Sequence, residues 1–149
     1  MIRKATKEDI GRIAYLILKW DAELPAELRM LDGDIPYAEQ AAGLVVTSDQ
    51  FYLCVLEIEG ALAGGYCLHA AQGVFSPKKY GQLLMWYVEP KYRGGRHGYK
   101  MLRHAIDVTK QSGLAWLEVN PWSDSRGAHS VLKKLGFTEA VHTFVMRTN

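Results

Sequence analysis

The chain has 149 residues, which is enough for one domain with a hydrophobic core and too few for two comfortable ones. Its composition, 48% hydrophobic and 23% charged, is that of an ordinary globular protein. The 18 basic and 16 acidic residues leave a net charge of +2, which argues against nucleic acid or a membrane surface as the main partner.

Nothing in the sequence predicts secretion or membrane insertion. The N-terminus turns polar after four residues, and no run approaches the ~18 apolar residues of a membrane span. Cys54 and Cys67 are too few for a disulfide-stapled secreted domain, so we expect both to be reduced and buried, with a bridge between them as the alternative. We therefore expect a cytoplasmic protein.

The first half of the chain predicts a strand, two helices and a β-hairpin. These elements are expected over residues 1–4, 6–18, 36–46, 51–58 and 61–70. Thr6 is typical of an N-cap with Asp9 three residues on, and Pro36 suits the first turn of the second helix. The acidic, proline-containing stretch 23–36 is expected to be a loop between the helices.

Two glycine patterns refine the predicted hairpin. Glu59-Gly60 separates the two strands as a tight turn. Gly64 and Gly65 lie inside the second strand, which predicts a bulge or a close approach of another backbone.

The second half of the chain predicts three strands and two helices in alternation. These elements are expected over residues 81–88, 98–112, 114–119, 128–135 and 141–146. Pro90 stops the first strand, and Gly113 and Gly136 end the two helices. The order predicts a single α/β domain over 1–149, with a mixed sheet covered by helices on both faces.

The segment 88–98, between a strand and a helix, combines three features of a pyrophosphate-binding loop. Glycines allow close backbone approach, the N-terminus of the next helix favours phosphate, and basic side chains add donors. The residues concerned are Arg93, Gly94, Gly95, Arg96, His97 and Gly98. The alternative is a glycine-rich turn with solvated arginines. The spacing matches neither a P-loop nor a dinucleotide fingerprint.

Val88-x-Pro-x-Tyr-Arg-Gly, with the glycine turn and helix after it, resembles the acetyl-CoA signature of the GNAT superfamily of acetyltransferases. Downstream, Leu117-Glu-Val119, Ala128 and Leu135-Gly-Phe137 resemble the second signature of that family. The order, the spacing and the predicted elements agree over nearly the whole chain. The resemblance implies a mostly antiparallel mixed sheet and transfer of an acetyl group from acetyl-CoA to an amine.

The resemblance also assigns cofactor contacts. The backbone amides of residues 93–98 would bind the CoA pyrophosphate, and the main chain of Tyr87 and Val88 would pair with the pantetheine arm. In the family this strand splays from the next one, which here ends in Val119 and Asn120.

Two positions depart from the family pattern. Arg96 stands where the family usually has glycine, which would cost about 1 kcal/mol if the turn were left-handed there, unless the loop shifts onto Gly95. Leu132 stands where a tyrosine often acts as general acid, so the acid is missing, replaced or unnecessary.

Glu118 is the first candidate for a general base, because partial burial among apolar neighbours would suit it to take a proton from the amine. The alternative is a strand-end glutamate that faces solvent or pairs with an arginine. Gln82 aligns with a catalytic glutamate of other members, and its amide could hold a water or polarise a carbonyl. Tyr87 is a further candidate with a structural alternative, and His69 would either line the acceptor pocket or pack.

The acceptor is expected to be a small-molecule or peptide amine. A cationic amine would suit the acidic residues of the N-terminal region, which otherwise form a solvated loop: Asp21, Glu23, Glu27, Asp32, Asp34 and Glu39. No metal is expected, since the histidines and cysteines lack ligand spacing. A homodimer would match common family behaviour. The competing hypotheses are a non-catalytic acyl-CoA-binding module and a partner-binding domain without cofactor.

Overall fold

The structure, a computed structural model, describes residues 1–121, 126–140 and 145–148. Within these residues, five strands form one sheet in the order β1-β2-β3-β4-β5. Neighbouring strands are antiparallel except β4 and β5, which are parallel. The strands are β1 (Ile2–Lys4), β2 (Phe51–Ile58), β3 (Ala61–Gln72), β4 (Lys79–Val88) and β5 (Leu117–Val119).

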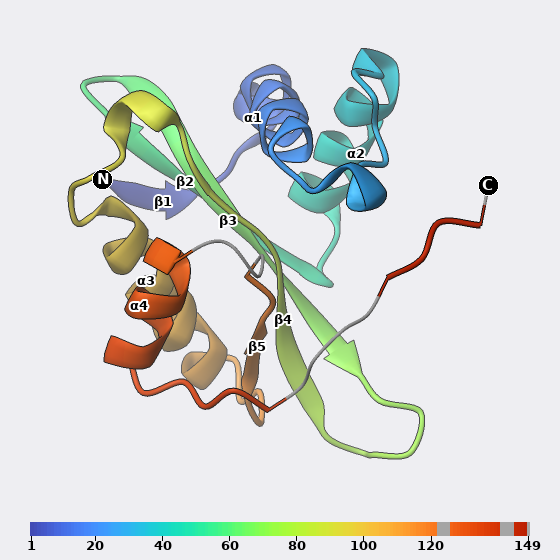
Figure 1. The fold of residues 1–149 in the computed structure, drawn as a ribbon, viewed down its shortest axis with the longest axis vertical. Coiled ribbons are helices and arrows are strands. Elements are labelled where there is room, and N and C mark those ends of the chain that lie inside the picture. Colours follow the sequence, from blue (N-terminus) through green and yellow to red (C-terminus); the bar gives the residue numbers. More distant parts are fainter. Residues whose placement is uncertain (122–125, 141–144, 149) are drawn as a thin grey trace.

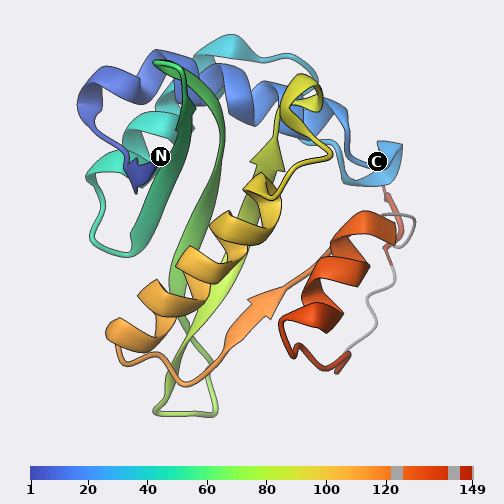
Figure 2. The same ribbon diagram turned by 90° about the vertical axis from the view of Figure 1, so that its left-hand side faces the viewer.

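Helices cover both faces of the sheet, as Figures 1 and 2 show. One face carries α1 (Ile10–Ala22) and α2 (Ile35–Thr47), and the other carries α3 (His97–Gln111) and α4 (Arg126–Lys134). Short 3-10 turns span Lys7–Asp9, Ala26–Leu28 and Pro90–Tyr92. The predicted α/β architecture is confirmed. Among the described residues, no helix has the length and hydropathy needed to cross a membrane.

Two strands predicted in the C-terminal half differ from expectation. The strand expected over 114–119 contains only Leu117–Val119, because Gly113 (φ +67°) ends α3 in a turn whose closing bond runs from Leu114 N to Thr109 O (3.1 Å). Of the strand expected over 141–146, residues 141–144 lie outside the described residues, and Val145 and Met146 are not in a strand.

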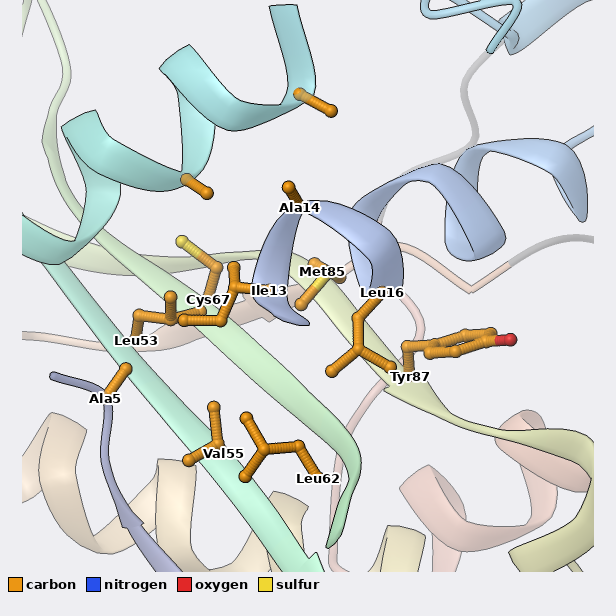
Figure 3. Close-up of a cluster of buried hydrophobic side chains, with 12 residues drawn as sticks. Ala5, Ile13, Ala14, Leu16, Leu53, Val55, Leu62, Cys67, Met85 and Tyr87 are labelled. Atoms are coloured by element: carbon orange, nitrogen blue, oxygen red, sulfur yellow. The ribbon is translucent and has the colours of Figure 1, made fainter. Parts of the chain in front are cut away.

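Each face of the sheet has its own hydrophobic core. On the α1 and α2 face, Ile13 and Leu16 pack against Leu53, Met85 and Tyr87 (Figure 3). On the opposite face, α3 and α4 pack against alternating residues of β2, β3 and β4, among them Cys54, Tyr66, Leu68 and Leu83 with Met101, Leu102 and Leu132. The alternation of strand side chains between faces therefore builds two separate apolar layers.

Cys54 and Cys67 lie in different cores, so the sheet itself separates them. Both are buried and free, which confirms the expectation of reduced thiols and excludes a bridge between them. Burial raises the pKa of the Cys67 thiol to about 12 and also raises the pKa of Cys54.

The glycines of the hairpin behave as the sequence predicts. Glu59 (φ 50°) and Gly60 (φ 79°) form a turn in which both central residues are left-handed. A Cβ at Gly64 would lie 2.3 Å from the carbonyl oxygen of Tyr87, and one at Gly65 would lie 2.7 Å from that of Cys54. The backbones of β2, β3 and β4 approach one another here more closely than any side chain would allow.

Asp9 ties the start of α1 to β1. Its carboxylate accepts two hydrogen bonds from Arg3 (2.8 and 3.0 Å) and one from Thr6 N (2.8 Å). The Arg3 hydrogen bonds, the largest contribution, lower the pKa of Asp9 to about 2 from an ordinary 3.8. Because the folded-state pKa is depressed, this stabilisation is complete above about pH 4 and is lost as the pH falls towards about 2.

We therefore expect Asp9→Asn to lower the free energy of unfolding at pH 7 by about 2 kcal/mol. The deficit should shrink between about pH 4 and pH 2, as the wild type protonates the same carboxylate. Urea unfolding at several pH values measures this, with the exposed Asp107→Asn as the control. Equal deficits at pH 7 and pH 2 would show that the Arg3 pairing does not stabilise the fold.

Candidate cofactor and acceptor site

The strands β4 and β5 separate part of the way along β4 (Figure 2). They pair through Gly81 with Leu117, Gln82 with Glu118, and Leu83 with Val119, and no later pair joins them in the described residues. The register of β3 against β4 also shifts at this point, so that Leu84 is an extra, bulged residue that is 41% exposed. We call this point, after Leu83 and Val119, the fork.

Beyond the fork, the edge of β4 from Leu84 to Val88 has no strand partner on the β5 side among the described residues. Unpaired main-chain N–H and C=O groups on a strand edge can bind an extended ligand that carries amides. The expected splay of these two strands is present. Asn120 follows β5 directly and is exposed.

The cofactor loop, residues 93–96, leads from β4 into α3. Its left-handed residue is Gly94 (φ +88°), whereas Arg96 has φ −88°. The strain anticipated for a non-glycine residue at position 96 is therefore absent, and no shift of the left-handed position onto Gly95 is needed. The glycine that the turn requires comes two residues earlier than the family pattern suggested.

The N-terminus of α3 presents donors at the end of this loop. Within the described residues, the backbone N–H groups of residues 94–99 donate to no backbone carbonyl. Free N–H groups and the dipole of a 15-residue helix together favour an anion at this point. Trp86 Nε1 donates to Gly98 O (3.2 Å) and so fixes the start of α3 on β4. Arg96 is exposed and His97 half-buried beside these amides.

The side chain of Arg93 makes contacts that its sequence position did not predict. Its Nε donates to Val88 O (2.7 Å), and its Nη2 donates to both carboxylate oxygens of Glu23 (2.7 and 2.9 Å). The guanidinium also lies over the Tyr87 ring, 5.3 Å from its centroid. The side chain of Arg93 thus holds the cofactor loop against the end of α1, while its main-chain N–H donates to Pro90 O (3.1 Å).

Tyr87 belongs to the same cluster. Its hydroxyl donates to Glu23 Oε1 (3.3 Å), and burial raises the pKa of Tyr87 to about 12, so the phenol stays protonated. Five residues along β4, about 16 Å, separate Tyr87 from Gln82. The structure therefore does not bring Tyr87 together with the other two predicted catalytic residues.

A second ion pair, which the sequence analysis missed, fixes the strand end before the cofactor loop. Arg12 Nη2 lies 2.6 Å from Glu89 Oε1 and also donates to Leu62 O (3.0 Å). The Glu89 side chain is only 10% exposed, so the pairing compensates a carboxylate withdrawn from water. The partners are 77 residues apart, and no local pattern points from one to the other.

Glu118 and Gln82 are brought together in a row that crosses the sheet. Glu118 of β5 is in register with Gln82 of β4, which is in register with His69 of β3 and through it with Phe51 of β2. Phe51 packs against the core beneath α1 and α2, so these side chains lie on that face. We call Glu118, Gln82 and His69 the polar row. At a strand spacing of about 4.8 Å it spans about 10 Å.

The ends of the polar row are held by aromatic rings. His69 stacks on Phe51 with ring centroids 4.9 Å apart. At the other end, Trp116 Nε1 donates to Glu118 Oε1 (3.0 Å). Glu118 is half-buried, and its partner is an indole rather than an arginine. Trp116 itself is 43% exposed, so its ring does not bury the Glu118 carboxylate.

Three of the six acidic residues of the N-terminal region have structural partners. Asp21 is buried and accepts hydrogen bonds from Met30 N (3.0 Å) and Leu31 N (3.2 Å). Asp34 caps α2 by accepting from Tyr37 N (3.0 Å), and Glu23 pairs with Arg93. Three of the six carboxylates therefore have structural partners, whereas Glu27, Asp32 and Glu39 are exposed, and a cationic acceptor stays a prediction.

The structure also shows where Leu132, at the position of the family's general acid, lies, and whether residues are grouped to bind a metal. Leu132 is buried between α4 and the core, where it offers no proton donor. Among the residues that the structure describes, no group of three or more histidines, cysteines, aspartates and glutamates is arranged to hold a metal ion.

Comparisons with known proteins bear on this arrangement. No curated protein matches the sequence. The structure is similar to the ribosomal-protein-alanine N-acetyltransferase from Brucella melitensis biovar Abortus 2308, at 16% identity and a TM-score of 0.76, with 99% of this chain and 97% of that one covered. It is also similar to AAC(6')-Iy in complex with the bisubstrate analog CoA-S-monomethyl-acetylneamine, at 12% identity and a TM-score of 0.79, with 100% and 97% covered.

A third similar structure is the aminoglycoside antibiotic 6'-N-acetyltransferase AAC(6')-IG from Acinetobacter haemolyticus, at 14% identity and a TM-score of 0.77, with 100% and 98% covered. At these identities the likeness shows the fold. The model of the acetyltransferase (GNAT) family matches residues 15–137, a range that includes the fork, the cofactor loop and the polar row. Since that match spans most of the chain, the protein belongs to the acetyltransferase (GNAT) family.

Proposed function

We propose that this protein is an acetyl-CoA-dependent N-acetyltransferase of the cytoplasm, in which a primary amine attacks the thioester directly. The observation that carries the proposal is the position of the fork, whose unpaired β4 edge leads to the free N–H groups at the start of α3. A strand edge suits the amides of a pantetheine arm, and the helix N-terminus suits a pyrophosphate. The names of two similar structures, a ribosomal-protein-alanine and an aminoglycoside N-acetyltransferase, support a peptide or small-molecule amine as acceptor.

Acetyl-CoA, when bound, supplies an activated acetyl thioester. The β4 edge at Tyr87 and Val88 would hold the arm through the Val88 N–H, since Val88 O already accepts from Arg93 Nε (2.7 Å). The amides of residues 94–98, with Arg96 and His97 beside them, would hold the pyrophosphate. Glu118 takes the proton of the attacking nitrogen, directly or through one water, and the Gln82 amide in the polar row holds that water. As the C–N bond forms, the C–S bond breaks. A thiol of pKa about 8.5 leaves as thiolate without an acid at Leu132.

Calorimetric titration of acetyl-CoA tests the cofactor assignment. We expect micromolar binding by the wild type and about tenfold weaker binding by Arg96→Ala, because a charge-assisted hydrogen bond to phosphate is lost. Arg93→Ala with Arg96→Ala should be weaker still, since the loop is also released from Glu23. Lys110→Ala, at the far end of α3, is the control. No binding by the wild type would contradict the proposal.

A second candidate is a non-catalytic acyl-CoA-binding module, favoured by the absence of a donor at Leu132. It predicts the same calorimetric result without release of CoA thiol when amines are added. If an amine makes CoA thiol appear faster than hydrolysis of acetyl-CoA alone does, the protein is an enzyme and not a binding module.

A further inference from the structure

A pair of stacked aromatic rings, one half-buried and one exposed, continues the surface that carries the polar row. Tyr80 of β4 and Trp116, the residue before β5, stack with centroids 4.8 Å apart and planes at 8°. We call this pair the aromatic stack. Trp116 keeps 43% of its surface exposed, a large fraction for a tryptophan that lies beside the edge of a sheet. Its indole N–H is the group that donates to Glu118.

The aromatic stack lies on the same face as Glu118 and Gln82, because residues two apart on a strand point to the same side. Among the described residues, this part of the face lies outside the core that α1 and α2 cover. The β4 side chains buried beneath α1 and α2 are Met85 and Tyr87, beyond the fork, whereas Tyr80 and Gln82 are only partly buried. A ligand that reaches the fork from this side therefore meets the aromatic stack and the polar row together.

The spacing sets the size of such a ligand. Trp116 precedes Glu118 by two residues, about 6.6 Å along the strand, and Val119 at the fork is one residue further. A ring packed on the stack would have its amine beside Glu118 if two or three methylene groups joined ring and nitrogen. The nitrogen would then lie next to the fork, where the thioester is expected.

We propose that the aromatic stack and Glu118 form the acceptor subsite, and that this subsite takes arylalkylamines with a two- or three-carbon tether. The proposal rests on the proposed acetyltransferase function and names the substrate class of that site. Aromatic rings pack favourably on other rings beyond the area they bury, which an alkyl group of the same size does not reproduce. Trp116 also acts as a positioning residue, since its N–H orients the carboxylate of Glu118.

The test compares phenethylamine with 2-cyclohexylethylamine, which has the same skeleton without an aromatic ring, and with benzylamine, whose tether is shorter. Thiol release at saturating acetyl-CoA gives kcat and KM for each amine. We expect the wild type to favour phenethylamine over both others in kcat/KM by about threefold to tenfold. Calorimetry of acetyl-CoA runs in parallel and should give the same Kd for every variant.

Two variants separate the roles of Trp116. Trp116→Ala removes the ring and should raise KM for phenethylamine by about tenfold, with a smaller rise for 2-cyclohexylethylamine. Trp116→Phe keeps a ring and loses the N–H donor, so we expect kcat to fall with both amines while the preference for phenethylamine remains. Phe75→Ala is the matched control, because Phe75 is fully exposed in the β3–β4 loop, away from the fork.

Equal kcat/KM for phenethylamine and 2-cyclohexylethylamine, or an unchanged KM in Trp116→Ala, would overturn the inference while leaving the acetyltransferase proposal standing. A kcat unchanged in Trp116→Phe would remove the positioning role. Acetyl-CoA binding without thiol release for any amine would contradict the proposed function, and the inference with it.

Discussion

Replacing Glu118 with glutamine is expected to lower kcat for acetyl transfer by about 100-fold or more, with the Kd of acetyl-CoA unchanged. A carboxylate can take the proton of the attacking amine, whereas an amide cannot. Glutamine has the same length, and its Oε1 can still accept the Trp116 hydrogen bond that Glu118 accepts at 3.0 Å. The change therefore removes the base with little alteration of shape. CoA thiol release measures kcat, and calorimetry measures cofactor binding.

The matched control is Asp107→Asn, which removes a carboxylate from an exposed position on α3, behind the other face of the sheet. It should leave kcat within about twofold of the wild-type value. Glu118→Asp keeps a carboxylate but shortens the side chain, so an intermediate kcat is expected. If Glu118→Gln retained half of the wild-type kcat, the proton would have to leave by another route, and His69 at the far end of the polar row would be the next residue to change.

Gly64→Ala should destabilise the fold by about 3 kcal/mol or more, and insoluble expression would be an extreme form of the same result. An added Cβ would lie 2.3 Å from the carbonyl oxygen of Tyr87 and 3.0 Å from Cα of Val88. Both neighbours are backbone atoms of β4, so no side chain can rotate to relieve the clash. The ladder must open at Gly64 and Val88, next to the main chain expected to hold the pantetheine arm.

Urea unfolding measures the change, and two other glycines calibrate it. Gly43 in α2 has nothing within 4 Å of an added Cβ, so Gly43→Ala should be neutral or stabilising by up to about 1 kcal/mol. Gly65→Ala places its Cβ 2.7 Å from Cys54 O and should resemble Gly64→Ala. A Gly64→Ala protein as stable as Gly43→Ala would mean that β3 and β4 can separate at low cost.

Features set by short stretches of chain could be predicted from the sequence. The Glu59-Gly60 turn, the capping of the helix after Thr6 and the ends of the helices at Gly113 and Gly136 each depend on backbone preferences of a few residues. The loop before α3 was also located correctly, because a glycine turn between a strand and a helix has few alternatives. Which of its glycines is left-handed could not be predicted, since the sequence allows Gly94, Gly95 or Gly98 and only the folded loop shows that Gly94 makes the turn.

Contacts between distant segments could not be predicted in this way. The sequence does not predict the pairing of Arg93 with Glu23, because Glu23 lies 70 residues earlier in the chain and only the folded α1 brings it to the loop. The bulge at Leu84 depends on the register of β3 against β4, which a single strand does not reveal. Trp116 could have been assigned, however, because residues 116 and 118 share a face of any strand that contains them.

The separation of Cys54 and Cys67 gives the protein an intrinsic chemical reporter in each of its two cores. Both thiols are buried and both have raised pKa values, so a thiol-reactive reagent can modify them only when the surrounding layer opens. Modification of Cys67 therefore reports the release of α1 and α2 from the sheet, and modification of Cys54 reports the release of α3 and α4. The layer of α1 and α2 and the layer of α3 and α4 can thus be followed independently in one chain that carries no substitution.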